Sequence, residues 1–387
     1  MENFTYCTPT RLIFGKDTIK KLPDVLKPFG KKVLLTYGGG SIKKIGLYDE
    51  VKRLLSDFEI YELSGIEPNP KYSTSVLDGV KLCKDNNIDV ILAVGGGSVL
   101  DCSKAISVGA LYDGEPWDLI VHKAKAKKSL PLVDILTLAA TGSEYDGGCV
   151  ISRTETNDKV GYMDENLYPV ASILDPRYTF SVSKKQTAAG AADAINHIME
   201  QYFCEKHSDL TDGMCEAAIK SLIKNAKIAL KEPENYEARG EFMVDCSLAC
   251  NGILSVGNSA SGWPCHGMEH ALSAYYDITH GEGLAILTPR WMKYILNEKT
   301  IERFVSFGTH IFDIDKKLPE KEIADKTITM VYNLFQSFDI PMCLKDVGID
   351  DSKLSEMAHH IAVNEGLDKA WAPLYENDIL NILKDSL

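Results

Sequence analysis

Two segments in the second half of the chain carry residues that could bind a transition metal. Asp193 and His197 lie four residues apart in an alanine-rich segment expected to be helical, and His266 and His270 repeat this spacing. Side chains four residues apart emerge from one face of a helix, so each pair can reach a single ion. With His280, these residues could supply one carboxylate and three imidazoles to Fe²⁺, Zn²⁺ or a neighbouring divalent ion. The fifth residue would then be free for a catalytic role.

Each pair alone has a simpler interpretation, as two side chains of a helix surface or of the core. Together, in one predicted helical region, they favour a metal site. Gly281 follows His280 and indicates a helix end or a turn at that point.

The composition is that of a globular protein with room for two hydrophobic cores, because the chain has 387 residues, of which 45% are hydrophobic and 25% charged. Its net charge of −13 argues against nucleic acid or an anionic membrane as a partner. The beginning of the chain lacks a signal-peptide pattern, and no apolar run is long enough to cross a bilayer. The ten cysteines form no Cys-x-x-Cys pair and are expected to be reduced. We therefore expect a cytoplasmic protein.

The first half of the chain alternates short apolar runs with helical patterns, which predicts a Rossmann-like α/β nucleotide-binding domain with a parallel sheet over residues 1–182. Beyond residue 176 the patterns are helical only, and Ser183 with Gln186 is typical of a helix start. Residues 183–387 are therefore expected to form an all-α helical bundle that contains the metal site. Strands are predicted at residues 11–14, 32–37, 58–63, 90–94, 133–138, 148–151 and 170–174, and helices at 214–230 and 236–254.

A glycine-rich turn at residues 95–98 lies between a predicted strand and a helix that is expected to begin near Asp101. Backbone N–H groups and a helix N-terminus can surround a diphosphate there, and glycine allows it to approach closely. The run is not the Gly-x-Gly-x-x-Gly pattern, so a tight turn without a ligand is the alternative.

A second glycine run at residues 38–40 ends another predicted strand and is followed by Ser41, Lys43 and Lys44. No acid stands in this turn to bind a ribose hydroxyl. A hydroxyl and ammonium groups suit the 2′-phosphate of NADP(H) better than they suit NAD(H). The alternative for the two lysines is a solvated helix start.

The whole chain resembles the iron-containing (group III) alcohol dehydrogenases, and most closely their NADPH-dependent butanol dehydrogenase and aldehyde reductase branch. The motifs that carry the resemblance follow the family order and are jointly specific. They are Thr8-Pro9-Thr10-Arg11 with Phe14-Gly15, Tyr37-Gly38-Gly39-Gly40-Ser41, Gly65-Ile66-Glu67-Pro68-Asn69-Pro70, Gly95-Gly96-Gly97-Ser98-Val99-Leu100-Asp101, Thr141-Gly142-Ser143-Glu144, Asp193 with His197, and His266 to His270 with His280-Gly281.

The resemblance implies a role for each matching residue, in an active site between an α/β domain and a helical domain. The implied metal ligands are Asp193, His197, His266 and His280, with His270 as a catalytic residue beside the metal. The predicted cofactor-binding residues are Gly38, Gly39, Ser41, Lys43, Gly95, Gly96, Gly97, Ser98, Asp101, Thr137, Thr141, Ser143 and Lys159.

Three positions depart from the family pattern. Asp146 and Gly148 stand where relatives often carry Asn or Thr and Asn, respectively, and Thr279 precedes His280 where many relatives have Pro. These departures leave the metal-binding motif intact and bear on the contacts expected with the substrate and the nicotinamide.

The expected reaction is hydride transfer between NADP(H) and a short-chain aldehyde or alcohol, with one Fe²⁺ or Zn²⁺ per subunit stabilising charge on the substrate oxygen. Apolar residues near the histidines, including Trp263, Pro264, Tyr275 and Tyr276, favour a small aliphatic aldehyde. We expect a homodimer.

Two alternatives remain at this point. One is a lyase of the dehydroquinate synthase type, which shares a nicotinamide and a metal but needs basic residues for an anionic substrate. Residues 263–282 contain no lysine or arginine. The other is a non-catalytic metal or nucleotide sensor, which would not require His270.

Overall fold

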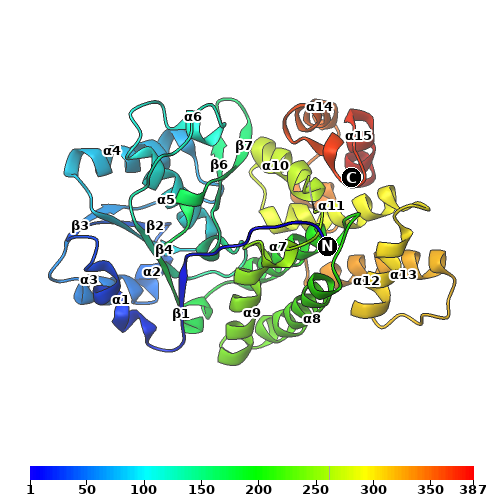
Figure 1. Ribbon diagram of the computed structural model, residues 1–387, viewed down its shortest axis with the longest axis horizontal. Helices are drawn as coiled ribbons and strands as arrows, with labels where there is room; N and C mark the ends of the chain where they lie inside the picture. The colour runs from blue at the N-terminus through cyan, green and yellow to red at the C-terminus, as the bar shows by residue number, and fades with distance from the viewer. Residues whose placement is uncertain (261) are drawn as a thin grey trace. The chain divides into compact units, whose positions relative to one another are not determined.

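The computed structural model describes residues 1–260 and 262–387, and these form two compact units (Figure 1). The α/β unit contains Cys7–Val182 and Glu232–Asn251. The helical unit contains Met1–Tyr6, Ser183–Lys231 and Gly252–Leu387.

The α/β unit is built on a parallel six-stranded sheet with the strand order β1-β8-β5-β4-β2-β3. Strands β2, β4 and β5 are buried along almost their whole length, as expected for a parallel sheet covered on both faces. The sheet confirms six of the predicted strands. Their bounds are β1 (Arg11–Phe14), β2 (Lys32–Tyr37), β3 (Glu59–Leu63), β4 (Val90–Gly95), β5 (Leu132–Leu136) and β8 (Ala171–Leu174).

The seventh predicted strand, β6 (Gly148–Arg153), lies outside this sheet. It pairs antiparallel with β7 (Asp158–Met163), which the sequence pattern did not predict. In β7 only Lys159 and Tyr162 are buried, so its sequence lacks the continuous apolar run of a central strand. The β6–β7 hairpin packs against α5 (Gly97–Gly109).

Helix α5 begins at Gly97, within the glycine run of residues 95–98, and not near Asp101 as predicted. A Cβ atom on Gly97 would lie 2.6 Å from the side chain of Thr141, so only glycine permits this close approach. The other helices of the unit that precede the domain boundary are α1 (Leu22–Leu26), α2 (Ser41–Lys44), α3 (Leu47–Leu54), α4 (Leu77–Asn86) and α6 (Trp117–Ile120).

Helix α9 (Tyr236–Ala249) belongs to the α/β unit, although residues 183–387 were expected to form one continuous helical domain. The Ser247 hydroxyl donates a hydrogen bond to buried Glu144, and a Cβ atom on Gly240 would lie 3.1 Å from the ring of Phe14. These contacts hold α9 in its unit. The helix also ends five residues before the predicted Leu254.

The helical unit is organised around α7 (Lys184–Tyr202), which packs against α8 (Asp209–Lys231), α10 (Pro264–Tyr276) and α11 (His280–Ile295). The predicted start of α7 is confirmed, since Ser183 Oγ accepts a hydrogen bond from the Gln186 N–H at 3.2 Å. Further helices of this unit are α12 (Ile301–Ile311), α13 (Glu320–Gln336), α14 (Leu354–Asn364) and α15 (Glu376–Asp385). Among the described helices, none is long and apolar enough to cross a membrane.

His280 is the first residue of α11, so the interpretation of Gly281 as marking a helix end or turn is corrected to a helix start. A Cβ atom on Gly281 would lie only 2.0 Å from the carbonyl oxygen of Ala189 on α7. The glycine is therefore there because the two helix backbones meet at this point. This contact brings His280 close to the residues of α7.

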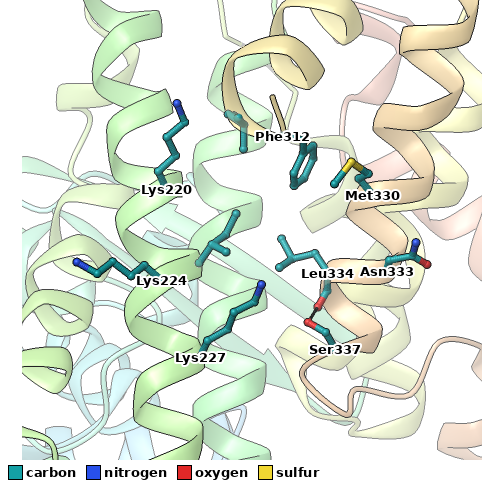
Figure 2. Close-up of a pocket in the computed structure, with 10 residues that line it drawn as sticks. Lys220, Lys224, Lys227, Phe312, Met330, Asn333, Leu334 and Ser337 are labelled. Atoms are coloured by element: carbon teal, nitrogen blue, oxygen red, sulfur yellow. Dashed lines mark hydrogen bonds between the residues drawn. The ribbon is translucent and has the colours of Figure 1, made fainter. Parts of the chain in front are cut away.

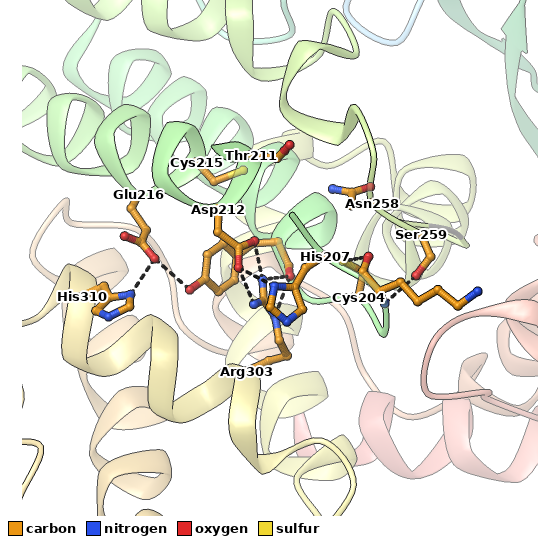
Figure 3. Close-up of polar contacts among 12 residues, drawn as sticks. Cys204, His207, Thr211, Asp212, Cys215, Glu216, Asn258, Ser259, Arg303 and His310 are labelled. Carbon is orange, nitrogen blue, oxygen red and sulfur yellow. Dashed lines mark hydrogen bonds and ion pairs between the residues drawn. The ribbon is translucent and has the colours of Figure 1, made fainter. Parts of the chain in front are cut away.

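A buried arginine ties three of these helices together (Figure 3). The Arg303 guanidinium on α12 donates to both carboxylate oxygens of Asp212 on α8, at 2.6 and 2.8 Å. It also donates to the Tyr202 carbonyl at the end of α7, at 3.1 Å from Nε, and lies 4.0 Å from the centre of the Tyr202 ring. Burial alone would lower the pKa of Arg303, but the Asp212 carboxylate raises it, so the arginine stays charged.

We expect Arg303→Met to lower the free energy of unfolding of the helical unit by about 3 kcal/mol, because removing one partner leaves the other charge poorly compensated. Urea denaturation followed by circular dichroism measures this change. The exposed Lys299→Met is the matched control and should change stability little. Equal unfolding midpoints for wild type and Arg303→Met would show that the network does not stabilise the unit.

Candidate metal centre and nucleotide turn

Three histidines from three helices converge on a single carboxylate oxygen, Oδ1 of Asp193. The Nε2 atom of His197 lies 3.2 Å from it, that of His280 3.6 Å and that of His266 3.7 Å. Among the described residues, ligand atoms of Asp193, His266 and His280 all lie within 4.8 Å of one another. His197 is outside that group but stacks on His266, with ring centres 4.8 Å apart.

Two buried glutamates orient two of these imidazoles. Glu200 lies on α7 and contacts Nδ1 of His266, while Glu269 lies on α10 and contacts Nδ1 of His280. Glu200 also accepts a hydrogen bond from the backbone N–H of Cys265 at 2.6 Å. Because Nδ1 is held on the carboxylate side, Nε2 of each ring points towards Asp193. This is the arrangement by which proteins fix the tautomer of histidines that bind a metal.

Burial and charge set the protonation of the cluster. Burial alone would raise the pKa of Asp193, but the surrounding imidazoles lower it below its usual range, so the carboxylate is ionised. Burial lowers the pKa of His197 to about 3, which leaves this ring neutral. For His266 burial is outweighed by Glu200 and Asp193, which raise its pKa to about 9.

The cluster fits a divalent cation. Within the described part of the chain, Asp193 Oδ1 and His266 Nε2 are buried and have no hydrogen-bond partner. Leaving such polar atoms unpaired is costly, and a cation between them would satisfy both. Three buried carboxylates, those of Asp193, Glu200 and Glu269, surround the position and favour positive charge. Imidazole nitrogen with carboxylate oxygen suits Fe²⁺ and Zn²⁺.

Trp263 borders this cluster, with its ring centre 5.2 Å from that of His266 and 5.8 Å from that of His197. Its backbone has φ 38° and ψ 62°, a left-handed conformation that is rare for a bulky residue. Tyr275 and Tyr276 were expected beside the histidines, but both rings lie 5.6 Å from the Lys353 ammonium, and the Tyr275 hydroxyl bonds to Glu356 on α14.

His270 lies next to the cluster but outside the convergent group. Its ring stacks on that of His280 with centres 6.0 Å apart, and its Nδ1 lies 3.7 Å from a Glu365 oxygen. In the described structure this Nδ1 is buried without a hydrogen bond. His270 thus lies beside the candidate metal position, and its Nδ1 makes no hydrogen bond there.

In the α/β unit, residues 95–98 connect β4 to α5 as the sequence predicted, and the N-terminal N–H groups of α5 face the turn. The Gly95 carbonyl accepts a hydrogen bond from the Thr137 N–H at 2.9 Å. The Thr141 side chain lies beside Gly97, 2.6 Å from where a Cβ atom on that residue would be. The turn is therefore bordered by two of the threonines predicted to line a cofactor.

Asp101 and Ser143 are joined directly, because the Ser143 hydroxyl donates to Asp101 at 2.7 Å. The second Asp101 oxygen accepts from the Val150 N–H at 2.9 Å. Burial raises the pKa of Asp101 to about 6, against the opposing effect of Lys104. Asp101 therefore connects α5 to Ser143 and to Val150 on β6.

Asp146, a departure from the family pattern, has a partner that the sequence reasoning missed. Lys104 is fully buried on α5, and its ammonium contacts an Asp146 carboxylate oxygen at 2.7 Å and the Gly148 carbonyl at 2.7 Å. Burial would lower the pKa of Lys104, but Asp146 and Asp101 raise it. Asp146 thus balances a buried charge. Lys159 is buried on β7, the strand paired with β6.

The second glycine turn, residues 38–40, follows β2 and precedes α2, next to the first turn in the sheet. The Lys43 ammonium is exposed and lies over the rings of Tyr37 and Tyr48, at 5.1 and 4.8 Å from their centres. The hydroxyls of both tyrosines donate to Glu62 at the end of β3. The nearby carboxylate is therefore already engaged.

Sequence reasoning missed the two glutamates of the metal cluster, although each stands at helical spacing from a histidine. Glu200 follows His197 by three residues, and Glu269 follows His266 by three. This spacing indicates only a shared helix face. Nothing in it tells which imidazole each carboxylate meets, and Glu269 in fact contacts His280 from the next helix.

Comparison with known proteins identifies the family of this chain. The chain matches the model for iron-containing alcohol dehydrogenase over residues 9–176 and the model for the C-terminal region of the Fe-containing alcohol dehydrogenase family over residues 187–387. It is 47% identical over 390 residues to NADH-dependent butanol dehydrogenase A of Clostridium acetobutylicum, with all of both chains covered. The chain belongs to the iron-containing alcohol dehydrogenases.

Two further relatives of this alcohol dehydrogenase differ in the cofactor that their names give. The chain is 37% identical over 361 residues to the NADPH-dependent aldehyde reductase YqhD of Escherichia coli, and the match covers 92% of this chain and 91% of the relative. The crystal structure of NADH-dependent butanol dehydrogenase A from Thermotoga maritima superimposes with a TM-score of 0.95 at 38% identity, covering 100% and 99% of the two chains.

Family membership makes the protein an oxidoreductase that acts on alcohols or aldehydes and implies a metal and a nicotinamide cofactor. The relatives described above are all oxidoreductases, which favours hydride transfer over the lyase and sensor alternatives.

We expect His266→Ala to lose bound iron and activity while keeping the fold, since apolar contacts supply most of the stability of the helical unit. Metal analysis of protein purified without air, together with circular dichroism, measures both. His359, which is exposed and pairs with Glu376 at 2.9 Å, provides the matched control His359→Ala. Stoichiometric iron in His266→Ala would rule out this position for the ion.

We expect Glu269→Gln to weaken metal binding about 10- to 100-fold, the usual effect of removing a carboxylate that orients a metal-binding histidine. Competition with a chelator measures the affinity. Glu376→Gln removes the equivalent contact from the exposed His359 pair and should leave the affinity unchanged. An unaltered affinity in Glu269→Gln would mean that His280 needs no such support.

Proposed function

We propose that the protein reduces short-chain aliphatic aldehydes such as butanal with NADPH, and that Asp193, His197, His266 and His280 hold a divalent iron ion. The observation that carries the proposal is the convergence of three imidazoles on one buried carboxylate oxygen. The same donors accept Zn²⁺. The names of the relatives, butanol dehydrogenase and aldehyde reductase, support the substrate class.

The chemistry of aldehyde reduction assigns separate tasks to the residues. Hydride arriving at the carbonyl carbon places negative charge on the oxygen, and a divalent ion in the cluster would stabilise that charge as a Lewis acid. Glu200 and Glu269 keep the imidazoles oriented while this charge develops. The developing alkoxide also needs a proton. We assign the delivery of this proton to His270, because its Nδ1 makes no hydrogen bond in the described structure.

The turn at residues 95–98 is assigned to the diphosphate of the cofactor. Its support is the N-terminus of α5 directly behind Gly96, where N–H groups and the helix dipole favour an anion. Thr137 and Thr141 border this turn, and Ser143 contacts Asp101 on α5. These three residues would line the remainder of the cofactor, and Lys159 is assigned to its ribose. Orientation of the nicotinamide is the contribution expected from this unit.

The preference for NADPH is supported by the turn after β2. Residues 38–44 carry a hydroxyl and two lysines and no carboxylate, and the Lys43 ammonium is held over two aromatic rings. Glu62, at the end of the neighbouring strand β3, is engaged by Tyr37, Tyr48 and Lys52. Two relatives at 46–47% identity are named for NADH, so this preference has to be measured.

The proposal is tested by adding butanal to the iron-loaded protein and following the absorbance of NADPH. A loss of absorbance that depends on both butanal and iron is expected. Failure of iron-loaded protein to oxidise NADPH or NADH with any short-chain aldehyde would refute the proposal.

We expect His270→Ala to bind iron normally and to lose about two to four orders of magnitude in butanal turnover, the range typical of a removed general acid or base. A histidine that only fills space would cost less than about tenfold, or about 1.4 kcal/mol. Steady-state rates and metal content of the same preparation distinguish the two. Loss of iron from His270→Ala would instead identify this residue as a ligand.

We expect Gly39→Asp to lower kcat/KM for NADPH by at least about tenfold, because the carboxylate repels the 2′-phosphate. The substitution fits sterically, since nothing lies within 4 Å of a Cβ atom on Gly39 and its φ is not positive. Gly39→Asn has the same shape without the charge and should retain NADPH use. A wild-type enzyme with higher kcat/KM for NADH than for NADPH would contradict the assignment.

A further inference from the structure

A surface groove in the helical unit lies between α8, α12 and α13 and belongs neither to the metal cluster nor to the nucleotide turn (Figure 2). Its volume is about 410 Å³, within the range of about 300–1,000 Å³ typical of small-molecule sites. The lining residues are Lys220, Ile223, Lys224, Lys227, Ile311, Phe312, Met330, Asn333, Leu334 and Ser337.

One side of the groove is positively charged. Lys220, Lys224 and Lys227 occur at a spacing of four and three residues on α8. In Figure 2 the Lys227 side chain extends towards the groove, whereas that of Lys224 extends away from it. All three are exposed, and in the described structure none forms an ion pair or a hydrogen bond. By contrast, Lys321 and Lys326 on the neighbouring α13 pair with Asp325 and Glu322.

The charge of these lysines is not balanced within the groove. No aspartate or glutamate is among its lining residues. Glu216, one turn before Lys220 on α8, is engaged by His310 and by the Tyr202 hydroxyl. In a chain of net charge −13, such a group of ammonium ions provides a local attraction for an anion.

The opposite side and the floor of the groove are mostly apolar, with Asn333 and Ser337 as the polar residues there. Leu334 and Ile311 are buried at 7% and 6% exposure, and Met330 remains 38% exposed at the edge. Figure 2 shows Phe312 and Met330 facing each other across from the lysine-bearing helix. Such a surface favours an aliphatic chain, whereas the lysines favour an acidic head group.

We propose that this groove binds a single-chain amphipathic carboxylate, a medium-chain fatty acid, with its head group near Lys227 and Lys220 and its chain against Phe312, Met330 and Leu334. The combination of charge and apolar floor matches a ligand that has both an acidic group and an aliphatic chain. This site is independent of the proposed reduction reaction.

The test is calorimetric titration of the full-length protein with decanoate below its micelle concentration, with acetate as the head group alone. Decanoate should bind and acetate should not. Replacing Lys220, Lys224 and Lys227 together by Gln should weaken decanoate binding by at least about fivefold. High salt should weaken binding to the wild type and have less effect on the triple variant.

Two matched controls separate the groove from other effects of charge. Lys125→Gln with Lys127→Gln and Lys128→Gln removes the same charge from exposed positions of the α/β unit and should leave binding unchanged. Met330→Glu should abolish binding by repulsion at an already exposed position, whereas Met330→Gln should retain most of it.

Several results would overturn the proposal. These are the absence of decanoate binding, equal binding of acetate and decanoate, binding that survives both the triple variant and Met330→Glu, or loss of binding in the α/β control. Binding of phosphatidylglycerol vesicles without binding of free decanoate would also overturn it, in favour of a lipid surface.

Discussion

The buried carboxylate of Asp193 is the constraint on which the functional half of the structure depends. An ionised oxygen at the centre of a helical unit is stable only where positive charge or hydrogen-bond donors surround it. Imidazoles from α7, α10 and α11 surround this oxygen at 3.2–3.7 Å without a hydrogen bond to it, and the close contact of Gly281 with Ala189 brings the third helix near enough. The packing of these helices therefore also sets the positions of the side chains that would bind the metal.

The same principle orders the surroundings of the cluster. Glu200 and Glu269 are buried, and each is stabilised by the imidazole that it orients. The carboxylates therefore do not compete with Asp193 for a cation but direct Nε2 of their partners towards it. A cation between these groups would convert a set of poorly paired buried atoms into a satisfied one, which couples metal binding to the stability of the unit.

In the α/β unit, buried charge serves a different purpose. Lys104 with Asp146, and Asp101 with Ser143, connect α5 to the segment between β5 and β6 and are directed inwards. These contacts fix the start of α5 and the glycine turn through side chains of α5, and the N–H groups of the turn stay available for an anion. Asp146 balances the charge of Lys104, which is fully buried.

The sequence alone determined six strands of the sheet, the start of α7, the glycine turn and the family, because apolar runs, helix caps and motif order are local properties. It also predicted the five residues of the metal region. The sequence did not reveal that α9 belongs to the α/β unit, that His280 begins a helix, or that Glu269 serves His280 and not its own neighbour His266. Each of these depends on which helix faces pack together, and packing between segments far apart in the chain leaves no periodic signal in either of them.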